Sequence, residues 1–173
     1  AEELSQAGFV LISTMPAVSE ALGMLDAVEF PCLVSFVITA AGDLFDGTPL
    51  RDAIARIDDA TPRAPLGYWI NCVHPGALLK GLAAQGDSPA LRRIVGVQGN
   101  TSPLDPREFS QVSEFADDSA AVFAGAMAQV HRRFSIPVVG GCCGTRREHL
   151  EELARALGAT PAREPAARIR ARR

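Results

Sequence analysis

The stretch VVGGCCGT, residues 138–145, sets two cysteines side by side between glycines. Its first half has the composition of a short strand buried on both faces. On a regular strand, neighbouring side chains point to opposite faces, so the thiols of Cys142 and Cys143 would diverge there. The flanking glycines relieve that restriction because they let the backbone bend sharply. We therefore expect both sulfurs to point toward one site at the C-terminal end of a strand.

Strand-like and helix-like segments alternate along the rest of the chain. The expected strands lie within residues 9–14, 31–38, 66–72, 91–100 and 136–141. The expected helices are 16–30, 49–60, 75–86, 106–134 in one or two pieces, and 145–158, with a further helix end at 1–8. Thr145 is expected as the N-cap of the last helix, with Glu148 three residues on. Apolar strands alternating with helices predict an α/β fold with parallel strands, in an open sheet or a barrel.

Composition excludes several classes of protein. A chain of 173 residues that is 47% hydrophobic and 21% charged is typical of one globular domain. A net charge of −3 argues against a nucleic-acid binder, and no run of about 18 apolar residues predicts a membrane span. Without a secretory signal pattern, we expect a cytoplasmic protein. Residues 159–173 hold five Arg against one Glu and predict a disordered basic tail.

The unusual residues gather where the expected strands end. These positions are Ser13, Thr14, Ser35, Asn71, Cys72, Gln98 to Asn100, and Gly141 to Cys143. In α/β folds the chemistry collects at the C-terminal ends of parallel strands, which share one rim. No G-x-G-x-x-G follows the first strand, so a dinucleotide site is not expected.

Cys72 would therefore approach Cys142 and Cys143 on that rim. Three converging thiolates suit zinc, and three protein ligands with one open position are typical of a catalytic zinc site. The alternative is that Cys72 is a small core residue and the pair forms a vicinal disulfide or two inert thiols. Cys32 lies inside an apolar strand, and we expect it in the core.

Several segments together resemble the zinc-dependent homocysteine S-methyltransferase family, which includes betaine–homocysteine methyltransferases and the homocysteine domain of cobalamin-dependent methionine synthase. The motifs are INC (70–72) and GGCCGT (140–145), with STMP (13–16), the SF (35–36) and DGTP (46–49) segment, and GVQGNTSPLDP (96–106). The resemblance runs from residue 1 to about residue 159. It implies a (β/α)8 TIM barrel, of which residues 1–158 would supply about the last five βα units.

The resemblance also implies a site. The family's zinc ligands fall on Cys72, Cys142 and Cys143, and the sulfur of homocysteine takes the fourth position. Candidates for substrate binding at the strand ends are Ser13, Thr14, Asn71 and Gly141, and no catalytic residue is expected beyond the metal site. The resemblance further implies Zn²⁺ as the cofactor, homocysteine and a small-molecule methyl donor as the partners, and methionine as the product.

Two departures from the family pattern leave alternatives open. Ser13 stands where the family has a Glu that helps to hold the amino group of homocysteine. The first three strands of the barrel are not matched, so the chain reads as an N-terminally truncated enzyme with exposed edges that favour self-association. The alternatives are a non-catalytic zinc-binding remnant or split subunit that needs another chain, and a methyltransferase for a different thiol or selenol.

Three further polar residues have more than one interpretation. His74 could line the pocket or reach the metal, although the third cysteine already fits. Asn100 could support the metal ligands or form a turn. His149, in the first turn of the last helix, is expected to be structural.

Overall fold

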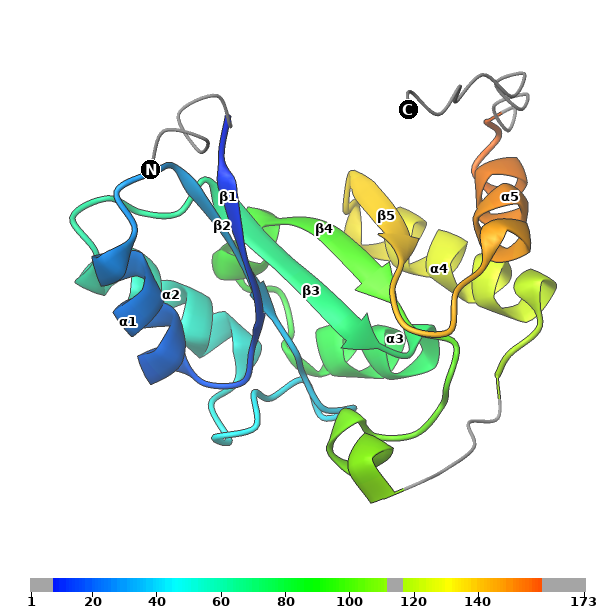
Figure 1. Ribbon diagram of the computed structural model, residues 1–173, viewed down its shortest axis with the longest axis horizontal. Helices are drawn as coiled ribbons and strands as arrows, with labels where there is room; N and C mark the ends of the chain where they lie inside the picture. The colour runs from blue at the N-terminus through cyan, green and yellow to red at the C-terminus, as the bar shows by residue number, and fades with distance from the viewer. Residues whose placement is uncertain (1–7, 112–116, 160–173) are drawn as a thin grey trace, which may run out of the picture.

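The computed structural model describes residues 8–111 and 117–159. Its centre is one sheet of five parallel strands in the order β1-β2-β3-β4-β5 (Figure 1). The strands are β1 (Val10–Met15), β2 (Cys32–Phe36), β3 (Gly67–Val73), β4 (Ile94–Gly99) and β5 (Val138–Gly141). Each lies within or overlaps a range expected from the sequence, so the predicted α/β fold with parallel strands is confirmed.

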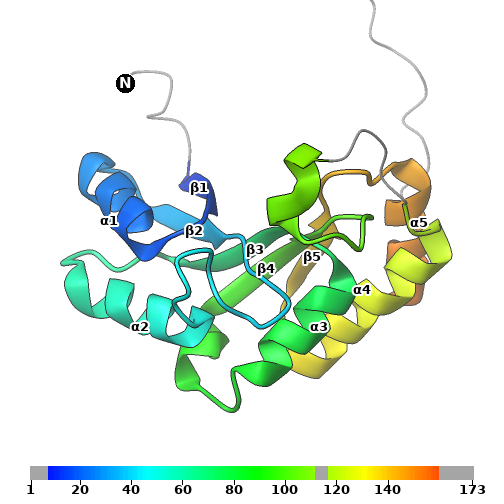
Figure 2. The ribbon, with the colours of Figure 1, turned by 90° about the horizontal axis from the view of Figure 1, so that it is seen from below.

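A helix follows each strand. The α-helices are α1 (Val18–Ala27), α2 (Leu50–Ala60), α3 (Pro75–Ala84), α4 (Ala120–Phe134) and α5 (Arg147–Ala156), with 3-10 helices η2 (Pro89–Arg93) and η3 (Pro106–Gln111). Figure 2 shows the α-helices ranged along one face of the curved sheet. Helices on one face of consecutive parallel strands form part of a β/α barrel, as predicted. None of the described helices is long and apolar enough to cross a membrane.

The core lies between the sheet and these helices. Phe36, Tyr68 and Ile70 are completely buried on the helix side of β2 and β3. The rings of Phe36 and Tyr68 stack with centroids 5.9 Å apart. Each side chain of this size contributes roughly 1.5–3 kcal/mol by leaving water. Cys32 is only 4% exposed and belongs to the same core, as the sequence predicted.

The other face of the sheet is open. Among the described strands, β1 and β5 each pair on one side only. Phe9, Leu11 and Val138 are 51%, 39% and 48% exposed. The register aligns Trp69 with Gly96 and Gly96 with Val138, so Trp69 and Val138 share this inner face. The predicted exposed edges and apolar interior are therefore present in the described part of the chain.

Some predicted boundaries are wrong. Thr145 does not cap α5, because the N-cap is Arg146 and the helix begins at Arg147. The Thr145 hydroxyl instead donates to the carbonyl of Cys142, and the ring of His149 takes the capping role expected of Glu148. The segment 106–134, by contrast, forms two separate elements, η3 and α4, which is one of the two forms expected. The helix end expected at 1–8 and the tail at 159–173 fall, apart from Gly8 and Ala159, outside the described residues.

The inner face makes one prediction about stability. A side chain at Gly96 would overlap the ring of Trp69, whereas Gly23, exposed in α1, has nothing within 4 Å of an added methyl group. We expect Gly96→Ala to lower the free energy of unfolding by about 1–3 kcal/mol through overpacking. Gly23→Ala should raise it by about 0.5–1 kcal/mol through helix propensity. Urea unfolding of both variants measures the difference, and equal effects would contradict the described packing.

Candidate metal centre

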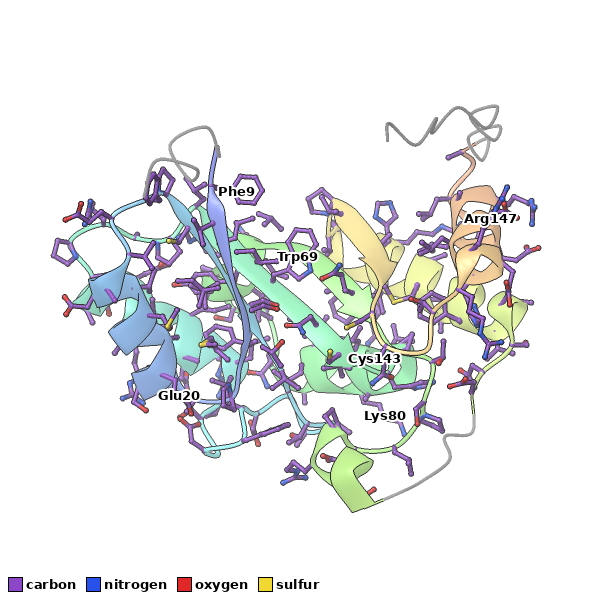
Figure 3. All side chains as sticks on the ribbon, in the orientation of Figure 1. Phe9, Glu20, Trp69, Lys80, Cys143 and Arg147 are labelled. Carbon is purple, nitrogen blue, oxygen red and sulfur yellow. The ribbon has the colours of Figure 1, made fainter. Side chains whose placement is uncertain are left out.

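Three cysteines meet at the C-terminal rim of the sheet. Cys72 is the penultimate residue of β3, while Cys142 and Cys143 directly follow β5. Figure 3 shows Cys143, on the loop after β5, close to the end of β3. Cys72 and Cys142 are half-buried and Cys143 is exposed, so the cluster opens to solvent on the Cys143 side.

The three sulfur atoms lie close together. The Sγ of Cys72 is 2.8 Å from that of Cys142 and 3.8 Å from that of Cys143. The Sγ atoms of Cys142 and Cys143 are 3.9 Å apart. This is the one group of three or more potential metal-ligating side chains found in the described part of the chain. The sequence-distant thiol therefore joins the vicinal pair, as predicted.

Unusual backbone conformations aim these side chains. Cys72 has a φ of 56°, in the left-handed region, and the β3–β4 register is irregular between Asn71 and Val73. A positive φ is uncommon for a residue other than glycine. The Cys72 carbonyl accepts a hydrogen bond from the side-chain amide of Asn100 at 3.0 Å. Asn100 thus supports the backbone of Cys72 from the next strand.

The loop after β5 is held by the end of β4. The Cys142 amide donates to the Gly99 carbonyl at 2.7 Å, and the Thr101 amide donates to the Cys143 carbonyl at 3.2 Å. Gly144 has a φ of 77°, and a side chain there would overlap the hydroxyl of Thr101. A side chain at Gly141 would overlap Thr145. The two glycines therefore act as predicted, since they let the loop turn both sulfurs to one side.

The three thiols differ in the direction in which their pKa values are shifted. The hydrogen bond from Cys72 lowers the pKa of Cys142 to about 5. The pKa of Cys72 lies far above its ordinary value because of that same hydrogen bond and of burial. Burial also raises the pKa of Cys143. These shifts favour Cys142 as the first of the three thiols to ionise, and a bound cation would favour deprotonation of all three.

The sulfur spacing suits a tetrahedral zinc ion. Zinc–sulfur bonds of about 2.3 Å with tetrahedral angles separate ligand sulfurs by about 3.8 Å. The two distances to Cys143, 3.8 and 3.9 Å, already match this spacing. The 2.8 Å distance between Cys72 and Cys142 is that of a hydrogen-bonded pair and would have to open. An all-sulfur donor set favours zinc over hard cations, so the residues present fit the metal.

Three of the four predicted substrate residues, Ser13, Thr14 and Asn71, form a second polar group on the same rim, whereas Gly141 ends β5 beside Cys142. The Asn71 side chain donates to the Thr14 hydroxyl at 2.7 Å and accepts from the Thr14 amide at 3.1 Å. The Ser35 hydroxyl also donates to Asn71. Ser13 is exposed, with its hydroxyl 3.2 Å from that of Thr14. Asn71 therefore ties β1, β2 and β3 together and holds Thr14, whose φ is 61°.

The homocysteine S-methyltransferase family matches residues 3–157. The chain belongs to this family. It is 27% identical over 148 residues to homocysteine S-methyltransferase YbgG of Bacillus subtilis, covering 82% of this chain and 44% of that protein. It is also 27% identical over 142 residues to methionine synthase of Mycobacterium leprae, covering 75% of this chain and 10% of that protein.

A solved family structure shares the fold. The apo homocysteine methyltransferase MmuM from Escherichia coli matches with a TM-score of 0.56 at 22% sequence identity. The match covers 88% of this chain and 51% of that one. The chain spans less than half the length of the two curated relatives.

The sequence did not single out every polar residue of this rim. Ser35 was noted as a polar strand end but not as part of the site, although it is the only polar residue in CLVSF. Asp117 and Asp118 were missed because they precede α4 in a segment expected to be helical. The Nε2 of His74 is hydrogen-bonded to the carboxylate of Asp118 at 2.8 Å, and His74 does not join the sulfur cluster. His149 is structural, as predicted.

The glycine beside the cysteines can be tested against a matched glycine elsewhere. Gly144 and Gly86 both have positive φ, 77° and 69°, but only Gly144 lacks space for a side chain. Alanine at either position costs about 1–2 kcal/mol through backbone strain. Gly144→Ala should cost about 1–3 kcal/mol more, because it overlaps Thr101. Chemical denaturation of the two variants checks this, and equal losses would contradict the described loop.

Proposed function

We propose that this chain supplies the zinc–thiolate part of a homocysteine S-methyltransferase site, which transfers a methyl group to the thiol of homocysteine to give methionine. The observation that carries the proposal is the convergence of three cysteine sulfurs from two strand ends. Family membership supports the reaction class.

Cys72, Cys142 and Cys143 would hold the metal. Zinc bound there would keep the homocysteine sulfur as a thiolate at neutral pH, and the thiolate is the nucleophilic form. The exposed side of the cluster, at Cys143, leaves access for a fourth ligand. The hydrogen bonds from Asn100 to Cys72 and from Cys142 to Gly99 hold the ligand backbones in place before substrate arrives. Such preorganisation limits the cost of orienting the reacting sulfur.

The remaining substrate contacts are assigned to the second polar group. Ser13 and Thr14 present hydroxyls at the end of β1, and Asn71 and Gly141 lie beside the cysteines. Ser13 offers a neutral hydroxyl where the family pattern has a carboxylate, so it would bind the amino group of homocysteine more weakly. This difference favours testing other thiols and selenols as acceptors. The second substrate is a small-molecule methyl donor, and the reducing cytoplasm suits the reaction because it protects free thiols.

A second candidate follows from the open face of the sheet. The chain would be a split subunit or a non-catalytic zinc-binding remnant whose inner face is covered by another chain or by a second copy. This reading is favoured by the exposed Phe9, Leu11 and Val138, and by the sides of β1 and β5 that pair with no other described strand. Exposed sheet edges promote association.

Zinc content tests the metal centre. We expect the chain, purified under reducing conditions with zinc, to bind about one equivalent by elemental analysis. Cys143→Ala should lose most of this zinc, because it removes one of three ligands. Cys32→Ala is the matched control, since Cys32 is buried in β2 away from the cluster. Metal-free wild-type protein, or equal loss in both variants, would refute the proposed ligands.

Methyl transfer and native mass separate the two candidates. We expect the zinc-loaded chain to methylate homocysteine only in an assembly in which its inner face is covered. The assay offers a panel of methyl donors and of thiol and selenol acceptors, with native mass spectrometry on the same samples. Turnover by a monomer would eliminate the split-subunit candidate, whereas a zinc-loaded assembly without turnover on any acceptor would eliminate the enzyme.

A further inference from the structure

We propose that Asp118 is a positioning residue that holds the two cysteine-bearing strand ends in register, through His74 on one side and His149 on the other. The inference rests on the proposed metal centre and concerns residues outside the ligand set. Asp118 lies in the segment before α4, and its side chain is 24% exposed.

The link to Cys72 runs through His74. His74 lies two residues beyond Cys72 and is the N-cap of α3. Its Nδ1 accepts a hydrogen bond from the Gly76 amide at 3.1 Å, so its Nε2–H donates to the Asp118 carboxylate at 2.8 Å. Both ring nitrogens are therefore engaged, and the ring has no nitrogen left for a metal. The end of β3, which carries Cys72, is thus connected to Asp118 by the hydrogen bond from His74.

The link to the vicinal cysteines runs through His149. This ring is buried, and its Nδ1 accepts from the Arg146 amide at 3.2 Å. Its Nε2–H therefore donates to the Asp118 carbonyl at 3.2 Å. Phe123 of α4 packs edge-on against the ring at 5.6 Å. Since His149 lies in the first turn of α5, which follows the cysteine loop, Asp118 also restrains that loop.

A third contact joins this segment to the end of β4. The Asp118 amide donates to the Thr101 carbonyl at 2.9 Å, and the Thr101 hydroxyl donates to the Asp117 carboxylate at 2.7 Å. Thr101 in turn donates its amide to Cys143. Asp118 therefore contacts the segments that follow β3, β4 and β5. The first and third of these adjoin the cysteines, and the second lies between them.

This arrangement has a consequence for metal affinity. β3 and β5 are not neighbours in the sheet, so the sheet alone joins their ends only through β4. Asp118 adds a second connection between them, through its carboxylate to His74 and through its main-chain carbonyl to His149. Without it, only the hydrogen bonds from the end of β4 would restrain the Cys72 end relative to the Cys142–Cys143 loop, and more of the ordering of the three sulfurs would fall on metal binding. Outer residues of this kind typically change metal affinity by about 10- to 100-fold.

Two variants break the connection from opposite sides. Asp118→Ala removes the carboxylate. His74→Asn keeps an N-cap that can accept from the Gly76 amide but is too short to reach Asp118. Asp118→Asn is the conservative variant, because its amide oxygen still accepts from His74. Asp58→Ala is the matched control, because the side chain of Asp58 is 28% exposed, close to that of Asp118. The carboxylate of Asp58 accepts hydrogen bonds from Arg93 and Tyr68 at the other end of the strands.

The measurement is zinc affinity by chelator competition, with the thiolate charge-transfer absorption of the cobalt-substituted chain as a second readout. We expect Asp118→Ala and His74→Asn to weaken zinc binding by about 10- to 100-fold and to alter the cobalt spectrum. Asp118→Asn should retain most of the affinity, and Asp58→Ala should lose stability but keep wild-type affinity.

Three outcomes overturn the inference. Wild-type zinc affinity in both Asp118→Ala and His74→Asn would show that the connection does not position the ligands. An equal loss of affinity in Asp58→Ala would show a general effect of stability. A wild-type chain that binds no zinc would instead refute the proposed metal centre, and the inference with it, so the two failures are distinguishable.

Discussion

The site depends on the hydrogen bonds made by the end of β4. Gly99, Asn100 and Thr101 bond the backbones of Cys142, Cys72 and Cys143 respectively. These short bonds fix the separation between two strand ends that are not neighbours in the sheet. They also impose the left-handed conformation of Cys72 and the glycine turn at Gly144. The position of the sulfur cluster therefore depends on where β4 ends. It also depends on β3 and β5 running parallel to β4, so that all three strands end on the same rim.

On the β1 side of the same rim, a second set of hydrogen bonds connects the strand ends. Asn71 joins the ends of β1, β2 and β3 and holds Thr14 in a left-handed conformation that is costly for a β-branched residue. Strained backbone of this kind persists where surrounding structure overdetermines it and clusters at functional sites. The sulfur cluster and the second polar group thus meet at adjacent residues, Asn71 and Cys72.

The sequence predicted what depends on composition and on strand order. Apolar runs located the five strands, and the polar residues at their ends located the rim, because parallel strands end on one side. The position of Cys72 against Cys142 and Cys143 followed from that rule. The contacts of Asp118 could not be predicted, since they depend on how the segment before α4 packs against two distant loops. Thr145 was misassigned because its hydroxyl bonds the Cys142 carbonyl, a tertiary requirement that overrides a local capping pattern.

The most direct test of the account is the X-ray absorption fine structure of zinc bound to the intact chain. The account predicts a first coordination shell with three sulfur atoms at about 2.3 Å and a fourth, lighter atom in the absence of homocysteine. Addition of homocysteine should raise the number of sulfur atoms to four. A shell of nitrogen and oxygen atoms at about 2.0–2.1 Å, with one sulfur or none, would contradict it.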